Sequence, residues 1–456
     1  MKLYSTLWQG EKPVLKTQET VFTRDDQDER NLINLYPEMR FQTLLGFGGA
    51  FTEATGYVLG KMPKESREDV LQAYFGKDGL GYTIGRTHID SCDFSLGNYS
   101  AVTDPTDISF ETMNLARDEE YILPYITRAQ DIAGRDIRML LAPWSPPAFM
   151  KTNGMKNGGG ALLPEYRSAW AKYIAKYISL LMARGVKPLA VSTQNEPKAV
   201  QTWDSCVYTA EEERDFVRDY LAPALKATGL DIGITIWDHN KERMFDRSQT
   251  ILADTGANDA VTGVAFHWYS GDHFEAIELT HLAHPDKQLI FTEGCVEYSR
   301  FSKGQLSNAQ MYAHDIIGNL NAGMHAFVDW NLVLDAQGGP NHVGNFCDAP
   351  IMCDIEAGTV EIKLSYHYIG HFSRYLKPGA VRIGKTVYTA GLEACAFQNL
   401  DGSIVCVTLN RSAQELPFTL RLNGKTSKLV VPAGSIQTAV IEATEWTDKA
   451  VRPIEG

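Results

Sequence analysis

Eight short apolar or β-branched runs recur between residues 43 and 330, and they constrain the possible folds more than any other feature of the chain. Helical patterns lie between several of these runs. In residues 166–184 apolar side chains recur every three or four positions and form one face. Eight strands that alternate with helices favour a closed parallel (β/α)8 TIM barrel over an open sheet. The predicted strands are residues 43–50, 82–88, 138–143, 188–193, 233–237, 263–267, 288–292 and 325–330.

The sequence on either side of this series is typical of antiparallel β-structure. After about residue 378, β-type runs are separated by Asp401-Gly402 and Asn423-Gly424, which are pairs that favour hairpin turns. The first 36 residues are also strand-like. We therefore predict a barrel over residues 37–376. Residues 1–36 and 377–456 are expected to combine in one accessory antiparallel β-sandwich.

The composition excludes several classes of protein. With 456 residues, 44% of them apolar, the chain can build a large core. The net charge of -13 and the lack of Lys/Arg clusters argue against a nucleic-acid partner. No stretch reaches the roughly 18 apolar residues of a membrane span, and residues 1–16 lack a secretory signal. We expect a cytoplasmic protein, and nothing in the sequence predicts its oligomeric state.

The seven cysteines do not indicate a disulfide framework or a metal site. Their number is odd and no CxxC pair is present. We expect reduced thiols that fill space in the core. Cys295 is a special case, because it lies two residues after Glu293 and could face the same cavity.

Polar and aromatic side chains follow the predicted strands directly. In a parallel barrel these strand ends converge on one mouth, where active sites form. Glu196 follows the run 189–193 and Glu293 follows the run 289–292, so both carboxylates are expected at this mouth. Paired carboxylates there are the groups that break glycosidic bonds. Other side chains at these ends are Arg86, Asp93, Trp144, Asn195, Asp238, His239, His267, Tyr269, Trp330 and Asn331.

A retaining glycosidase holds its two carboxyl groups about 5–5.5 Å apart, so that one can attack the anomeric carbon. The acid needs surroundings that raise its pKa, whereas the nucleophile must stay ionised and needs hydrogen-bond donors. Arg86 and Tyr269 are the candidates for these donors, and Tyr269 is also expected to bind substrate.

No metal or other cofactor is predicted. His367 and His371 are four residues apart and share one face of an expected helix, but no third ligand is evident. His239 and His267 could also act as ligands, although hydrogen-bonding roles at the mouth are favoured. Gly46-x-Gly48-Gly49 lacks the spacing of a dinucleotide-binding fingerprint.

Seven motifs occur in order over about residues 41–376. They are GFGGAFTEA from Gly46, SCDFS from Ser91, APWSPPAFMKTNG from Ala142, QNEP from Gln194, FHWY from Phe266, TEGC from Thr292 and DWNLVLDAQGGPNHVGNF from Asp329. In these motifs the chain resembles the glucosylceramidase-type family of glycoside hydrolases, family 30. The resemblance implies a retaining β-glycosidase on a (β/α)8 barrel with a flanking β-sandwich.

The resemblance also implies roles for single residues. Glu196 would be the acid/base and Glu293 the nucleophile. Asn195 would bind the sugar 2-hydroxyl, and Asp93 and Trp144 would bind hydroxyls on the far side of the ring. Trp330 would form an aromatic wall and Asn345 would lie at the rim. From their positions at the strand ends, independently of the resemblance, Arg86 and His267 are expected to have supporting roles.

Two departures from the family concern the residues around the glutamates. The family's human member has Ala where this chain has Gly294. The sequence of residues 198–208, which include Trp203, also differs from that of the family. Loops of this kind line the leaving-group side, so the leaving group stays open.

The favoured function is an exo-acting β-glucosidase with a glucosylceramidase-like site, and hence a role in sphingolipid metabolism. The alternative is the same mechanism on a β-1,6-glucan, a β-xyloside or a β-fucoside. A carbohydrate-binding protein without catalysis is disfavoured, because both glutamates are present. The expected partner is therefore a β-linked glycoside.

Overall fold

The structure is a computed structural model that describes residues 1–301 and 304–447. It divides into two compact units, each built from separate stretches of chain. One comprises Met1–Gly46, Lys303–His325 and Lys363–Gly456, and the other comprises Phe47–Ser302 and Ala326–Ile362. No helix among the described residues combines the length and the apolar character needed to cross a membrane.

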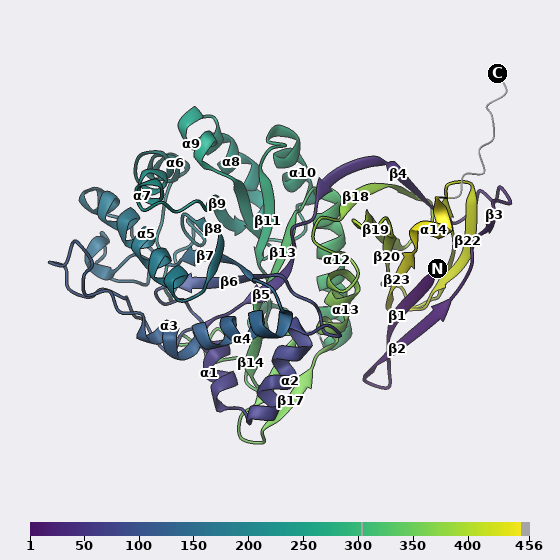
Figure 1. Cartoon of the computed structure of the whole chain (residues 1–456), viewed down its shortest axis with the longest axis horizontal. Coiled ribbons are helices and arrows are strands. Elements are labelled where there is room, and N and C mark those ends of the chain that lie inside the picture. The colour runs from purple at the N-terminus through teal and green to yellow at the C-terminus, as the bar shows by residue number, and fades with distance from the viewer. Residues whose placement is uncertain (302–303, 448–456) are drawn as a thin grey trace. The chain divides into compact units, whose positions relative to one another are not determined.

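The larger unit contains the predicted barrel, with eight strands in the closed order β10-β11-β13-β5-β6-β7-β8-β9. Figure 1 shows helices surrounding these strands. The strands carry mostly Val, Ile, Leu and small residues and are buried almost throughout, as expected where helices cover a parallel sheet. They are β5 (Gly46–Ala50), β6 (Ile84–Ile89), β7 (Arg138–Pro143), β8 (Lys187–Ser192), β9 (Gly233–Asn240), β10 (Gly263–His267), β11 (Gln288–Glu293) and β13 (Ala326–Asn331).

The helix predicted over residues 166–184 is present as α5 (Arg167–Ala183). Its buried face carries the expected apolar side chains, and Gly185 follows it at a φ of +91°. The other helices of this unit are α1 (Glu53–Lys61), α2 (Lys64–Phe75), α3 (Ala116–Tyr121), α4 (Leu123–Ala133), α6 (Ala210–Phe216), α7 (Ala222–Ala227), α8 (Met244–Leu252), α9 (Thr255–Ala260), α10 (Phe274–Ala283) and α11 (Tyr298–Phe301).

The first predicted strand, residues 43–50, is divided in the structure. Thr43 ends β4 (Leu32–Thr43), and the barrel strand β5 begins at Gly46. The two intervening residues bond elsewhere, since the Leu44 and Leu45 amides donate to the carbonyls of Ala380 and His325. One apolar stretch therefore belongs to two sheets. Its hydrophobicity does not indicate where the stretch is divided.

The smaller unit contains a ten-stranded sheet in the order β2-β1-β23-β20-β19-β18-β4-β21-β22-β3. The predicted pairing of the two chain ends is confirmed, because β1 runs antiparallel to β23 and β4 antiparallel to β18. One pair, β21 with β4, is parallel. The strands are β1 (Lys2–Gln9), β2 (Lys12–Glu19), β3 (Thr23–Arg24), β18 (Val381–Val387), β19 (Leu392–Gln398), β20 (Ile404–Asn410), β21 (Leu416–Leu422), β22 (Lys425–Val431) and β23 (Ser435–Ile441).

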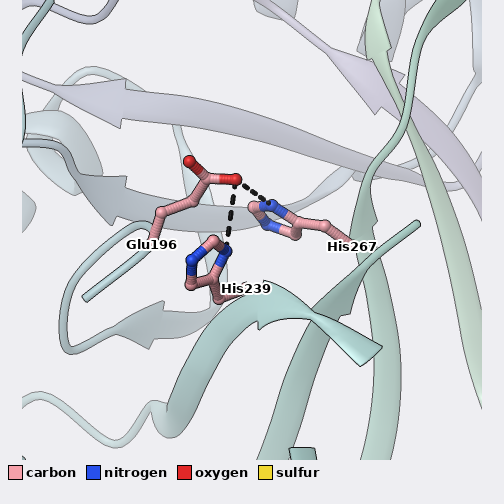
Figure 2. A group of neighbouring side chains, drawn as sticks. All are labelled: Glu196, His239 and His267. Atoms are coloured by element: carbon pink, nitrogen blue, oxygen red, sulfur yellow. Dashed lines mark hydrogen bonds and ion pairs between the residues drawn. The ribbon is translucent and has the colours of Figure 1, made fainter. Parts of the chain in front are cut away.

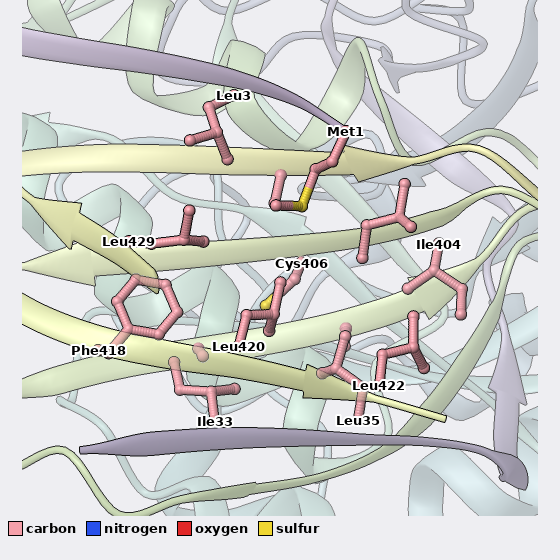
Figure 3. Packing of buried hydrophobic residues seen from close by; sticks show 14 of the residues in the cluster. Met1, Leu3, Ile33, Leu35, Ile404, Cys406, Phe418, Leu420, Leu422 and Leu429 are labelled. Atoms are coloured by element: carbon pink, nitrogen blue, oxygen red, sulfur yellow. The ribbon is translucent and has the colours of Figure 1, made fainter. Parts of the chain in front are cut away.

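Side chains from both ends of the chain share the core of this sandwich. Met1 and Leu3 pack in the same cluster as Phe418 and Leu420 (Figure 3). The predicted hairpin turn Asn423-Gly424 joins β21 to β22, with both residues at positive φ, as a type I′ turn requires. Burial of apolar side chains from the two ends explains why residues 1–36 fold with residues 377–456.

The remaining elements are short or lie beside these two sheets. Helices α12 (Gln305–Ala322) and α13 (Leu364–Ser373) pack against each other within the smaller unit. The other strands and α-helices are β12 (Val296–Glu297), β14 (Val333–Asp335), β15 (Cys347–Asp348), β16 (Ile351–Asp354), β17 (Thr359–Ile362) and α14 (Ala443–Trp446). All seven cysteines are buried and free, as predicted.

Candidate active site at the barrel mouth

A pocket lies beyond the carboxyl ends of the barrel strands, with an empty volume of about 510 Å³. Both predicted glutamates line it, and so do all six residues predicted to bind substrate. The lining residues are Asp93, Phe94, Trp144, Asn195, Glu196, Gln201, Trp203, His239, Asn240, Tyr269, Glu293, Cys295, Glu297, Arg300, Trp330, Asn345 and Cys347. The two carboxylates, 97 positions apart in the sequence, therefore share one cavity.

Glu293 is the last residue of β11 and receives two hydrogen bonds from the predicted donors. Arg86 Nη1 donates to Glu293 Oε2 at 2.6 Å, and the Tyr269 hydroxyl donates to Oε1 at 3.1 Å. Burial raises the pKa of the Glu293 carboxyl against the opposing charges of His267 and Arg86, and the nearby Glu196 raises this pKa further.

Glu196 follows β8 in a strained backbone conformation, with a φ of +49°. Its amide donates to the Asp238 carbonyl at 2.9 Å, which holds this conformation in place. Glu196 Oε1 lies 3.2 Å from His267 Nδ1 and 3.3 Å from His239 Nδ1 (Figure 2). Burial favours the neutral acid, but His239 and His267 outweigh burial and hold the pKa of Glu196 below its ordinary value. This is the opposite of the raised pKa expected for the acid, because two imidazoles face this carboxyl.

A buried network connects the two glutamates through Asp238. This carboxylate accepts hydrogen bonds from Arg86 Nη2 at 3.0 Å and from His267 Nε2 at 3.1 Å. Arg86 reaches Glu293, and His267 reaches Glu196, so the path runs continuously between them. Burial lowers the pKa of His267, but Glu293, Asp238 and Glu196 outweigh burial and raise it to about 9.

Two β-bulges shape this network. Ala265 and Phe266 of β10 pair with Trp237 and His239 of β9, so Asp238 is an extra residue. Phe266 and His267 pair with Phe291 and Glu293 of β11 in the same way, so Thr292 is extra there. Bulges re-aim side chains and are common beside active sites. Here the two extra residues meet, since the Thr292 hydroxyl donates to Asp238 Oδ1 at 2.5 Å.

The two predicted tryptophans form one buried wall of the pocket. The rings of Trp144 and Trp330 stack at a centroid distance of 5.3 Å and an angle of 15°. The Arg86 guanidinium lies over both, at 4.8 and 5.3 Å from their centroids. This cation–π contact helps to hold the guanidinium that bonds Glu293.

Asp93 lies in the same pocket and accepts a hydrogen bond from Asn341 Nδ2 at 3.3 Å. Burial raises the pKa of Asp93 well above its ordinary value, and the charges of Glu293 and Glu196 add to this effect. These surroundings favour the protonated form of Asp93, which can donate a hydrogen bond.

Several residues of the rim were not predicted. Gln201 and Trp203 come from the loop after β8, and Glu297 and Arg300 from the segment after β11. Arg300 Nη1 pairs with Glu297 Oε2 at 3.1 Å. Gln201 and Trp203 lie in an irregular loop, and Glu297 and Arg300 lie in the short elements β12 and α11, where no barrel-strand periodicity marks a mouth-facing position. The departure from the family over residues 198–208 was the only sequence signal for any of them.

The two departures noted in the sequence both lie at this site. A side chain at Gly294 would place its Cβ 2.5 Å from Phe291 Cζ and 2.8 Å from Trp268 Cε2. Glycine therefore allows both aromatic rings to pack beside the nucleophile candidate.

Cys295 faces the cavity, as the sequence suggested, with its Sγ 3.4 Å from the Tyr269 hydroxyl.

The two histidine pairs considered as metal ligands differ in the structure. Both ring nitrogens of His371 are engaged, with Thr438 and Thr6 hydroxyls at 2.8 Å, so this residue has no nitrogen left for a cation. Within residues 1–301 and 304–447, one group of three candidate ligands lies close enough together to hold a cation. It consists of Glu196, His239 and His267, whose ligand atoms all lie within 4.8 Å of one another.

Comparison with known protein families agrees with this geometry. The family model "Glycosyl hydrolase family 30 TIM-barrel domain" matches residues 44–376, and "Glycosyl hydrolase family 30 beta sandwich domain" matches residues 379–439. The lysosomal acid glucosylceramidase of Mus musculus is 32% identical over 406 residues, covering 85% of this chain and 79% of that protein.

Two of the matching solved structures cover nearly the whole chain. SrfJ from Salmonella typhimurium superposes with a TM-score of 0.92 at 38% identity, covering 97% of this chain and all of the other. The endo-β1,6-glucanase BT3312 superposes with a TM-score of 0.88 at 30% identity, covering 97% and 99%.

Proposed function

The chain belongs to glycosyl hydrolase family 30, and from this membership we propose that it is an exo-acting β-glucosidase of the glucosylceramidase type. Family 30 enzymes are retaining glycoside hydrolases, so the mechanism is a double displacement. The observation that carries the proposal is the single pocket that both glutamates line, with two hydrogen-bond donors directed at one of them.

In the proposed first step, a Glu293 oxygen attacks the anomeric carbon and the bond to the leaving oxygen breaks. Glu196 donates its proton to that oxygen, and a covalent glycosyl ester forms on Glu293. In the second step Glu196 takes a proton from water, which attacks the anomeric carbon and releases Glu293. The Arg86 and Tyr269 hydrogen bonds support Glu293 as the nucleophile, because they stabilise its carboxylate.

The charges around the pair suit the second step directly. Two neighbouring carboxyls repel each other when both are ionised, which favours the state with one proton on the pair. The first step requires this proton on Glu196 when a glycoside is bound. The His239 and His267 contacts then favour an ionised Glu196, which is the form that activates water.

The sugar ring is expected to contact the residues around the pair. Arg86 Nη2 donates to Asn195 Oδ1 at 2.8 Å, which leaves Asn195 Nδ2 to donate to the sugar 2-hydroxyl. Asp93 and Trp144 would bind hydroxyls on the opposite side of the ring. Trp330 would supply apolar surface for the sugar C–H groups, and Asn345 would contact the rim side.

Apolar residues exposed in the mouth loops support an apolar leaving group. Leu96, Met155 and Val200 lie in the loops that follow β6, β7 and β8 and are 39%, 56% and 68% exposed. Loops after barrel strands surround the active-site entrance. A lipid-like leaving group, as in a glucosylceramide, would cover these side chains.

A second candidate is hydrolysis of a β-1,6-linked glucan. Two observations favour it: the similarity to the endo-β1,6-glucanase BT3312, and the polar rim of the pocket. Gln201, Glu297, Arg300 and Asn345 would suit a leaving group rich in hydroxyls. The two candidates share their mechanism and differ in what occupies the rim.

A panel of substrates separates the two candidates. We would compare kcat/KM for glucosylceramide in detergent micelles, a β-1,6-glucan and its disaccharide, and aryl β-glucosides, β-xylosides and β-fucosides. The first proposal predicts the highest value among natural substrates for glucosylceramide. A preference for internal bonds of the glucan would replace it with the second candidate. Product stereochemistry followed by NMR tests the mechanism, and inversion would contradict both.

A further inference from the structure

Three side chains at the mouth are spaced as ligands of a tetrahedral cation. His239 Nδ1 lies 3.3 Å and His267 Nδ1 lies 3.2 Å from the same oxygen, Glu196 Oε1 (Figure 2). A tetrahedral Zn²⁺ with bonds of about 2.0–2.1 Å has ligand atoms roughly 3.3 Å apart along each edge. The two separations thus match two edges of such a site, and the two imidazole nitrogens lie within 4.8 Å of each other. Two histidines and one glutamate are also a common ligand set for zinc.

The supporting contacts of His267 are those of a metal ligand. Its other nitrogen, Nε2, bonds Asp238 Oδ1 at 3.1 Å, which fixes the ring with Nδ1 directed at Glu196. A carboxylate behind a ligating histidine in this manner is a general feature of zinc sites. Asp238 is itself held by Arg86 and Thr292, so the ring has little freedom to turn.

His239 offers a nitrogen that no hydrogen bond occupies. Its Nδ1 is buried and meets no hydrogen-bond geometry among the described residues, and Glu196 Oε1 lies 3.3 Å from it as an ion-pair partner. A buried imidazole nitrogen without a hydrogen bond costs free energy, which a bound cation would recover. His239 and Glu196 both line the pocket, so a fourth position remains open to water.

We propose that Glu196, His239 and His267 form a binding site for a divalent transition-metal cation such as Zn²⁺, and that its occupation inhibits the enzyme. The inhibition rests on the proposed role of Glu196: an Oε1 bound to a cation can neither donate nor accept the catalytic proton. Nitrogen ligands favour Zn²⁺, Cu²⁺ and Ni²⁺ over Mg²⁺ and Ca²⁺, which prefer all-oxygen sites. Binding releases to the solvent any proton that the ligand atoms carry.

Calorimetric titration with ZnCl₂ tests binding apart from catalysis. The protein is first treated with a chelator and then dialysed free of it. The variant Glu293→Gln keeps all three ligands and lacks the proposed nucleophile, so we expect it to bind one Zn²⁺ as the parent protein does. In His239→Gln and Glu196→Gln we expect at least tenfold weaker binding. MgCl₂ should give no binding at the same concentrations.

Two control variants exclude other ligands. Cys295→Ala removes a thiol that lines the same pocket, and His273→Asn removes an exposed histidine that pairs with Glu275. Neither change should alter the affinity for Zn²⁺ by more than about twofold. Loss of binding in Cys295→Ala would assign the cation to thiols and would overturn the proposal.

Hydrolysis of an aryl β-glucoside then tests the inhibition. We expect Zn²⁺ to inhibit the parent protein and a chelator to restore its activity, whereas Mg²⁺ has no effect. The concentration of Zn²⁺ that halves activity should rise at least tenfold in His239→Gln, measured against the uninhibited rate of that variant. The site does not exist if Glu293→Gln binds no Zn²⁺, or if His239→Gln binds it unchanged. An inactive parent protein that still binds Zn²⁺ through these residues would contradict the proposed function alone.

Discussion

Two buried histidines, one in each unit, have opposite electrostatic surroundings. His371, in the sandwich unit, lies between the hydroxyls of Thr6 and Thr438, and burial lowers its pKa to about 3. His267, at the barrel mouth, is equally buried, but Glu293, Asp238 and Glu196 outweigh burial and raise its pKa to about 9. Burial by itself makes a histidine neutral, and only surrounding carboxylates keep one charged.

The same contrast extends to the surroundings of each histidine. The sandwich core consists of apolar side chains such as Ile33, Phe418 and Leu420. The barrel mouth instead buries Arg86 and Asp238 as an ion pair beside two glutamates. Buried charges are a poor source of stability, because desolvation offsets their attraction. We infer that the sandwich core serves stability, whereas the mouth carries charges that the chemistry needs.

The largest expected effect is that of Glu293→Gln. If the charges at the mouth serve chemistry, this change should lower kcat by at least about a thousandfold, because it removes the proposed nucleophile. Glu297→Gln, at another carboxylate of the same pocket, should change kcat by less than about tenfold. Thermal unfolding should show Tm of Glu293→Gln unchanged or raised. If Glu293→Gln kept most of its activity, this charge at the mouth would not be needed for the chemistry, and the contrast with the sandwich core would be wrong.

Glu196→Gln should have an effect that depends on the leaving group. A general acid contributes typically about 10²–10⁴-fold, and an activated leaving group needs little of that help. We therefore expect kcat/KM to fall by a factor in this range for an alkyl β-glucoside. For a dinitrophenyl β-glucoside the rate of the first step should fall much less. Added azide should restore turnover of the activated substrate and yield a β-glucosyl azide. Equal losses for the two substrates would rule out the acid role.

In the sandwich, Leu420→Ala should affect stability and leave the chemistry intact. Truncation of a fully buried leucine costs about 2–5 kcal/mol, and Leu420 is completely buried. Leu400→Ala is the control, since Leu400 is 81% exposed in the same unit. Urea unfolding should show the loss in Leu420→Ala only, with kcat and KM at low temperature close to those of the parent protein. A selective loss of kcat would show that the core also serves catalysis.

The smallest effect concerns a buried carboxyl away from the pocket, at Asp118. Burial raises its pKa to about 7, although the Tyr177 hydroxyl donates to it. Between about pH 4, the ordinary value, and pH 7 the folded protein holds a proton that the unfolded chain releases. Its contribution to stability is therefore complete below pH 4 and is lost as the pH rises through 7.

Asp118→Asn should remove this dependence. We expect its Tm to exceed that of the parent protein by a few degrees at pH 8, with the difference vanishing near pH 4. Asp131→Asn, at an exposed aspartate, should follow the parent protein across the whole range. A constant difference at all pH values would mean that Asp118 is ionised in the folded protein throughout.

Much of the barrel was predictable because strand periodicity is local. The apolar runs that end near Glu196 and Glu293 were evident in the sequence, and barrel geometry then places both residues at one mouth. The hairpin turn at Asn423-Gly424 was predictable for the same reason, since its residue types meet a backbone requirement.

The roles of Asp238 and His239 at the site were not predictable in this way. Their orientation depends on the β-bulge at Asp238, where β9 shifts its register against β10. A bulge reverses the alternation of side chains, and no residue type in this run marks it. The break between Thr43 and Gly46 is similar, because it depends on bonds to Ala380 and His325, far along the chain.

From its residues alone the chain specified a parallel barrel, a β-sandwich made from both ends, and two glutamates at the strand ends. These properties follow from patterns that span a few residues at a time. Arg86 and Tyr269 were candidates as donors to Glu293 from the sequence, but folding had to supply the distances, and it alone paired His239 and His267 with Glu196. The charge state of a buried group depends on neighbours brought to it from distant strands, and no local pattern records those distances.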